Sequence, residues 1–144
     1  MFAVITLDAL DLAARAEYQA DALSHLVARD FATRGVISLR AEDTLAAARA
    51  VLAAHRHQGF PVLDENQRVV GVLTRRDLAD GAGDALVKTL IVRAPVVVHA
   101  DDTLRYVVTK MGHESVGRVP VLTRDGQLYG MLTRSDLFAA ATRK

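Results

Sequence analysis

The sequence predicts a mixed α/β (α+β) fold in which two β-α-β-β-α units pack sheet to sheet about a pseudo-twofold axis. The first observation is that three motifs occur twice, each time 59 residues apart and without a gap. They are Asp-Thr-Leu at 43–45 and 102–104, Pro-Val-Leu at 61–63 and 120–122, and Gly-x-Leu-Thr-Arg-x-Asp-Leu at 71–78 and 130–137. The second observation is that strand and helix patterns follow in the same order in both units. Since one unit is too small to cover its own sheet, two copies are expected to share their sheet faces.

The composition limits the classes of function. A hydrophobic fraction of 51% supports a folded core, and an aromatic fraction of 5% makes that core aliphatic. The net charge of +1 excludes a strongly electrostatic partner, so no nucleic acid is expected. The lack of cysteine excludes disulfides, a thiolate nucleophile and Cys-ligated metals. The apolar start ends at Asp8 and is too short to enter a bilayer, so we expect a cytoplasmic protein or a soluble module of a longer chain.

The elements of the first unit follow from periodicity and from helix-start and turn residues. Residues 8 to about 28 are rich in Ala and Leu without Gly or Pro, which predicts an N-terminal helix. Thr44 is a good N-cap, and the apolar spacing after it is helical. In order, the unit is expected to contain a strand at 36–39, a helix from Thr44, a hairpin of residues 60–63 and 68–73, and a helix from Thr74 that ends at 81–83.

The second unit repeats this order. Asp125-Gly126 is a strong turn signal between two β-rich runs. The expected elements are a strand at 96–98, a helix with the apolar stripe Leu104, Val107, Val108 and Met111, a hairpin of residues 119–123 and 127–132, and a helix from Thr133. We therefore divide the chain into an N-terminal extension (1–26), a first repeat (27–80), a hinge (81–85) and a second repeat (86–142).

The pair Thr74 and Asp77 forms a Thr-x-x-Asp pattern that returns at Thr133 and Asp136. One interpretation is structural, because such a Thr caps a helix and the acid three residues later reaches back to the cap. The other is nucleotide binding, because a helix start with a hydroxyl and a following arginine suits a phosphate, while an Asp accepts both hydroxyls of a ribose. A glycine stands three residues before each of these threonines, and an arginine follows each directly. Both features favour the nucleotide-binding interpretation.

With these motifs in order, residues 27–142 resemble a tandem pair of cystathionine-β-synthase-type (CBS) domains, the regulatory modules also called Bateman modules. The resemblance implies a CBS-pair fold with two symmetry-related clefts that take an adenine nucleotide or S-adenosylmethionine as regulatory ligand. No required cofactor is implied. The resemblance also implies a homodimer in the shape of a flat disc of four repeats.

The resemblance further implies which residues line each cleft, since adenine lies against the first strand of one repeat while the Thr and Asp come from the other. The first cleft is expected to combine Val36, Ile37, His57 and Gly59 with Arg118, Met131, Thr133, Arg134 and Asp136. The second is expected to combine Pro95, Val96 and Val116 with Val72, Thr74, Arg75 and Asp77. We expect the first cleft to bind phosphate better, because Arg118 stands where family members hold a basic residue and Gly59 is its counterpart in the first repeat.

Other polar patterns indicate neither a metal site nor catalysis. His55 and His57 stand at a helix end without a third ligand nearby in sequence, and no His is placed to activate Ser135. We therefore expect a non-enzymatic regulatory module that senses an adenosine-containing ligand. The alternatives are a structural dimerisation module without a ligand, and a cytoplasmic regulatory tail of a channel, transporter or metabolic enzyme that acts on a fused domain or a separate effector.

Apolar positions on the predicted helices indicate a homodimer. Val51, Ala79 and Phe138 need a cover, and a twofold-related copy is the commonest one. The helices after Thr44, Thr74, Thr103 and Thr133 are expected to form this contact, with the N-terminal helix clasping the partner. The alternative is that these side chains pack within the chain.

Overall fold

The computed structural model describes residues 22–142 and contains two three-stranded sheets, each accompanied by helices. The first repeat comprises β1 (Leu39–Arg40), α2 (Leu45–Ala53), β2 (Gly59–Leu63), β3 (Val69–Thr74) and α3 (Arg75–Ala79). The second comprises β4 (Val98–His99), α4 (Leu104–Glu114), β5 (Arg118–Leu122), β6 (Leu128–Thr133) and α5 (Arg134–Thr142). A short 3-10 helix precedes the strands of each repeat, η1 (Ala28–Asp30) in the first and η2 (Val87–Leu90) in the second. The predicted fold class and order of elements are confirmed.

The predicted threonine caps begin the helices. The Oγ1 of Thr44 accepts the Ala47 amide at 3.2 Å, and the Oγ1 of Thr103 accepts the Tyr106 amide at 3.1 Å. Each bond satisfies an N–H group that has no partner within its own helix. The apolar stripes then face inward, since Leu104, Val107 and Met111 are buried. Val108, which was predicted in the same stripe, is 41% exposed.

Each sheet has the same topology. The strand orders are β1-β2-β3 and β4-β5-β6, with a parallel first pair and an antiparallel hairpin. The first strands are shorter than predicted and begin later, at Leu39 instead of Val36 and at Val98 instead of Val96. The reason is that the chain crosses to the other repeat just before them. Thr33, for example, forms a β-bridge with Met131 of β6, so only the last two residues before the turn align with β2.

The two repeats exchange their first turns. Ala28 of η1 is buried in the core of the second repeat, and Val87 of η2 is buried in the core of the first. The Ala28 amide donates to the carbonyl of Asp102 at 2.8 Å, and the Val87 amide donates to that of Asp43 at 2.8 Å. Neither repeat therefore completes its core without the other.

The predicted helix over residues 8 to about 28 lies mostly outside the described residues. Its predicted end is wrong, because the helical conformation stops at Leu23 and the chain turns at Ser24 and His25. The cause is the bridge between Val27 and Thr103, which draws this segment onto the second repeat.

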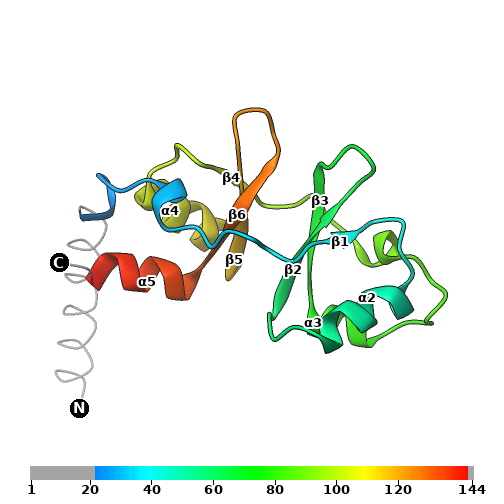
Figure 1. Ribbon diagram of the computed structural model, residues 1–144. Coiled ribbons are helices and arrows are strands. Elements are labelled where there is room, and N and C mark those ends of the chain that lie inside the picture. Colours follow the sequence, from blue (N-terminus) through cyan, green and yellow to red (C-terminus); the bar gives the residue numbers. More distant parts are fainter. Residues whose placement is uncertain (1–21, 143–144) are drawn as a thin grey trace, which may run out of the picture.

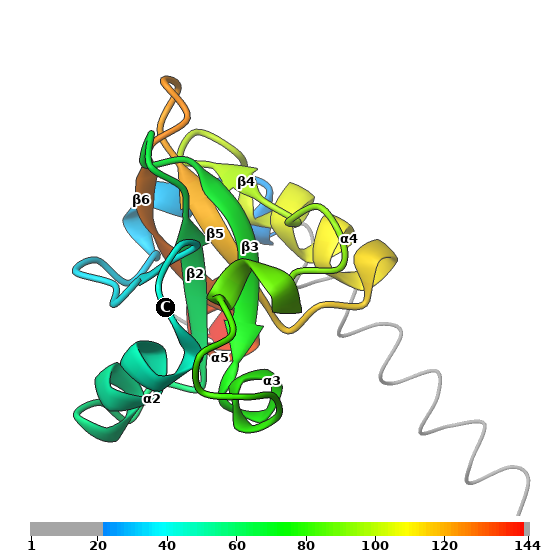
Figure 2. The same ribbon diagram turned by 90° about the vertical axis from the view of Figure 1, so that its right-hand side faces the viewer.

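The sheets form the centre of the molecule, with α4 and α5 on one side and α2 and α3 on the other (Figure 1). The view turned by 90° looks through one sheet onto the other, and β3 contacts β5 where they meet (Figure 2). Within residues 22–142, none of the helices combines the length and the apolar character that a bilayer crossing requires. The cytoplasmic location stays a prediction.

Candidate functional site

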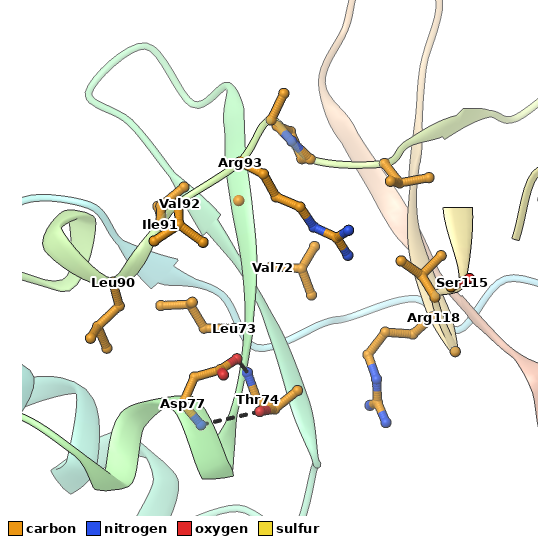
Figure 3. A pocket seen from close by; sticks show the side chains of 16 residues that line it. Val72, Leu73, Thr74, Asp77, Leu90, Ile91, Val92, Arg93, Ser115 and Arg118 are labelled. Atoms are coloured by element: carbon orange, nitrogen blue, oxygen red, sulfur yellow. Dashed lines mark hydrogen bonds between the residues drawn. The ribbon is translucent and has the colours of Figure 1, made fainter. Parts of the chain in front are cut away.

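A cavity of about 340 Å³ lies where the two repeats meet. Its walls are β3 with the start of α3, the connector that follows η2, and the loop between α4 and β5 (Figure 3). The apolar wall contains Val72, Leu73, Ile91, Val92, Val96 and Val116. The polar side chains are Thr74, Asp77, Arg93, Ser115 and Arg118. Such a cavity, with an apolar wall and a few convergent polar groups, is typical of a small-molecule site.

A glycine lets the connector approach β3. A Cβ on Gly71 would stand 2.9 Å from the Cδ1 of Ile91, closer than side-chain packing allows. The glycine of the duplicated Gly-x-Leu-Thr-Arg motif therefore has a packing role. It brings the connector close enough to form one wall of the cavity.

Thr74 and Asp77 form a complete capping box at the start of α3. The Thr74 amide donates to Asp77 Oδ2 at 2.8 Å, and the Asp77 amide donates to Thr74 Oγ1 at 3.2 Å. These bonds confirm the structural interpretation of the Thr-x-x-Asp pattern. They use one of the two carboxylate oxygens, so the capping box leaves Asp77 Oδ1 able to accept from a ligand. Figure 3 shows both side chains at the cavity wall.

Sequence reasoning did not name Arg93 and placed Arg118 elsewhere. Arg118 was expected in the first cleft, but its side chain lines this cavity. The expectation that the first cleft binds phosphate better rested on Arg118, which stands two residues before Pro120 and lines the second cleft. Which cleft binds phosphate better stays a prediction. Arg93 projects from the connector over Val72 (Figure 3). The 59-residue repeat could have drawn attention to Arg93, because it aligns Arg93 with Arg34.

The structure brings together most of the residues expected in the second cleft. Val72, Thr74, Asp77, Pro95, Val96 and Val116 all line the cavity. Of the residues expected in the first cleft, Arg118 lines this cavity. The others do not, and they are Val36, Ile37, His57, Gly59, Met131, Thr133, Arg134 and Asp136.

Asp136 repeats the capping geometry at the start of α5. Its Oδ2 accepts the Thr133 amide at 2.9 Å and the Thr133 hydroxyl at 3.1 Å. Next to it, Met131 exchanges two backbone hydrogen bonds with Thr33, at 2.8 Å and 3.0 Å. In the second cleft the counterparts of these two residues are Val72 and Val92, and Val92 is 92% exposed. The chain therefore pairs with β6 at Thr33, whereas within residues 22–142 Val92 forms no such bridge with β3. The cavity opens beyond the point where Ile91 packs against Gly71.

Arg75, which was expected beside a phosphate, has a structural role. Its guanidinium donates to the carbonyls of Leu52 at 3.0 Å and His57 at 2.6 Å, and also to that of His55. Leu52 lies in the last turn of α2, and His55 and His57 follow that helix, so Arg75 donates to carbonyls at and beyond its C-terminal end. Arg75 does not line the cavity.

The histidine pair and the ionised surface groups lie elsewhere. The rings of His55 and His57 are stacked with centroids 6.3 Å apart, and across residues 22–142 no group of three or more potential metal ligands gathers.

The hydrogen bond from Arg124 is the main cause that lowers the pKa of Asp101, and Arg29 lowers it further. The ion pair between Arg29 and Asp101 connects η1 to the second repeat.

Comparison with known proteins matches two CBS domains, at residues 28–83 and 87–143. An inosine-5'-monophosphate dehydrogenase of Korarchaeum cryptofilum is 31% identical over 112 residues, which are 77% of this chain and 23% of that protein. An L-aspartate semialdehyde sulfurtransferase of Methanocaldococcus jannaschii is 22% identical over 89% of this chain and 26% of its own length. The chain thus spans about a quarter of the length of these curated relatives.

Solved structures share the fold. The CBS domains of a transcriptional regulator from Streptococcus pneumoniae superpose with a TM-score of 0.70 at 27% identity, covering 78% of this chain and 97% of that one. CBSX2 in complex with AMP superposes with a TM-score of 0.70 at 26% identity, covering 81% of this chain and 96% of that one. The duplicated motifs, the two sheets with exchanged first turns and these matches agree that the chain belongs to the CBS domain family and carries two such domains in tandem.

Proposed function

We propose that this chain is a non-enzymatic regulatory module that binds an adenosine-containing ligand in the cavity between its two CBS domains. The candidate ligands are AMP, ADP, ATP and S-adenosylmethionine. The proposal is carried by one observation: an apolar wall, a hydroxyl–carboxylate pair and a guanidinium from different elements line one cavity. The complexes of related modules with AMP, such as that of CBSX2, support it.

The cavity walls suggest how such a ligand lies. An adenine ring fits the apolar surface of Val96 and Val116, where the backbone of the connector offers hydrogen bonds. The ribose hydroxyls donate to Asp77 Oδ1, the carboxylate oxygen that the capping box does not use. The first phosphate lies at the Thr74 hydroxyl and Arg118, since a guanidinium binds phosphate with two parallel hydrogen bonds. The residues expected in the first cleft are then a second and weaker site.

Regulation follows from the position of the cavity between the repeats. A ligand that contacts β3 of the first repeat and the connector and Arg118 of the second favours one relative orientation of the two. It changes the output only if its affinity differs between two orientations. We propose that the output is received by a fused domain or a separate effector.

The test is calorimetric titration of the purified chain with AMP, ADP, ATP and S-adenosylmethionine. We expect saturable binding of at least one of them and a matching rise in melting temperature. Ribose 5-phosphate is the control, because it carries the sugar and phosphate without the base. Its binding should be much weaker, since it leaves the apolar wall uncovered. No binding of any adenosine compound at millimolar concentration would leave the dimerisation module as the better account.

A homodimer is the second candidate function, alone or together with ligand binding. Phe138 of α5 is 67% exposed and Tyr106 of α4 is 48% exposed. Val51, in contrast, is half-buried against the core of the first repeat, as the alternative of packing within the chain requires. We propose that the helix faces around Phe138 contact a second copy of the chain.

A further inference from the structure

We infer that the cavity selects adenine nucleotides with two or three phosphates over AMP and S-adenosylmethionine, through Arg93 and Arg118. This inference rests on the proposed function and specifies its ligand. It starts from the positive charge of the cavity. Two guanidiniums line the cavity and face one carboxylate, that of Asp77, which already accepts a hydrogen bond in the capping box.

Arg118 lies at one end of the cavity. Its Nη1 is 2.8 Å from where a Cβ on Gly59 would stand, and Gly59 pairs with Thr74 across the β2–β3 hairpin. The guanidinium of Arg118 is therefore beside Thr74, where the proposed pose puts the first phosphate. A monophosphate is within reach of this arginine.

Arg93 enters from a different wall. It belongs to the connector, it is exposed, and its side chain extends across Val72 into the space between the repeats (Figure 3). Over residues 22–142, the side chains of Arg93 and Arg118 make no hydrogen bond or ion pair with protein groups. Both guanidiniums are therefore available to an anion that enters the cavity.

The duplication supplies an internal comparison. Arg34 is the counterpart of Arg93, and its guanidinium carbon lies 3.7 Å from the centre of the Tyr129 ring. That stacking holds Arg34 on the protein surface through a cation–π contact. The counterpart of Tyr129 is Val70, which has no aromatic face, so Arg93 has no such partner. Two equivalent arginines therefore differ in their surroundings, since Arg34 stacks on an aromatic ring and Arg93 points into a cavity.

The charges determine which ligand gains from this arrangement. AMP carries one phosphate, which reaches Arg118 and leaves Arg93 without a partner. ADP and ATP carry further phosphates that extend from Arg118 toward Arg93, where they gain one more charge-assisted contact than AMP. S-adenosylmethionine has no phosphate, and its sulfonium and ammonium groups outweigh its single carboxylate, so its net positive charge is repelled by two guanidiniums. The expected order of affinity is ADP and ATP first, AMP next, and S-adenosylmethionine last.

The test is calorimetry with ADP, AMP, adenosine and S-adenosylmethionine in EDTA, on the wild-type chain and the variants Arg93→Ala and Arg34→Ala. Arg93→Ala should weaken ADP by about tenfold, as the loss of one charged hydrogen-bond partner does, and leave AMP within about twofold. Arg34→Ala is the matched control, because it removes the equivalent arginine from outside the cavity and should change neither ligand. Melting temperatures of both variants report folding.

The outcomes separate this inference from the proposed function. If the wild-type chain binds AMP as tightly as ADP, or if Arg93→Ala weakens both equally, the phosphate selectivity is refuted while adenosine binding stands. If S-adenosylmethionine binds more tightly than ADP, the charge argument is refuted. If no adenosine compound binds, the proposed function fails and this inference fails with it.

Discussion

The side chain of Arg118 on β5 occupies the space beside Gly59 on β2, so a residue of the second repeat reaches its site only because the first repeat has a glycine there. A Cβ on Gly59 would stand 2.4 Å from the Cδ of Arg118 and 2.8 Å from its Nε. The sequence suggested that Gly59 marks a basic residue missing from the second cleft. The structure assigns the glycine a different role, which is to admit Arg118.

The variant Gly59→Ala should therefore weaken nucleotide binding without contacting the nucleotide. The added methyl displaces the Arg118 side chain, so we expect AMP affinity to fall by up to about tenfold, the loss expected for one charged contact. Calorimetry measures the affinity. Gly83→Ala is the control, because its Cβ would meet only Ala46 at an ordinary 3.6 Å. Equal AMP affinity in both variants would show that Arg118 is not positioned through Gly59.

The paired variants Asp77→Ala and Asp136→Ala decide which cleft is used. Each removes a capping carboxylate from the start of a helix, so each should lower the free energy of unfolding by about 1 kcal/mol. Only Asp77 lines the cavity. We expect Asp77→Ala to weaken ligand binding by about 10–150-fold and Asp136→Ala to have a much smaller effect. Urea unfolding and calorimetry measure the two quantities, and a greater affinity loss for Asp136→Ala would move the site to the first cleft.

Arg75 should matter for stability and not for ligand binding. Arg75→Ala leaves the carbonyls of Leu52, His55 and His57 without their guanidinium donor, so the free energy of unfolding should fall by about 1–3 kcal/mol. Arg76→Ala, at the exposed next position, should change it by less than about 0.5 kcal/mol. Chemical denaturation monitored by circular dichroism gives both values. A large loss of nucleotide affinity with unchanged stability would restore Arg75 as a ligand-binding residue.

Light scattering tests the proposed homodimer. At micromolar concentration the chain should have twice its mass of 15.6 kDa, because Phe138 and its neighbours need an apolar cover. Phe138→Lys should reduce the mass to that of one chain, since it places a charge in the proposed contact. Asn66→Lys adds the same charge at the exposed hairpin turn and should leave the dimer intact. A wild-type mass near 15.6 kDa would refute the dimer.

The duplicated motifs predicted much of the fold because local rules decide those features. Thr44 and Thr103 act as caps wherever the helix packs, and the hairpins follow from short-range turn residues. The late start of β1 and the position of Ala28 in the other repeat's core depend on long-range crossings that no local pattern encodes.

The candidate site was only partly predictable for the same reason. Thr74, Asp77 and Val96 belong to motifs or strands that the repeat makes visible. The use of Arg118 in the second cleft depends on which way one side chain turns at the contact between the sheets. The role of Arg93 depends on a difference between Tyr129 and Val70, which becomes informative only when the ring beneath Arg34 is seen.

The most direct test is an experimental structure of the chain crystallised with ADP. The account predicts the nucleotide between β3 and the connector, with ribose at Asp77, the first phosphate at Arg118 and the second phosphate at Arg93. The contradicting result is ADP bound between Ile37 and Asp136, or a cavity at Val72 without nucleotide at saturating ADP.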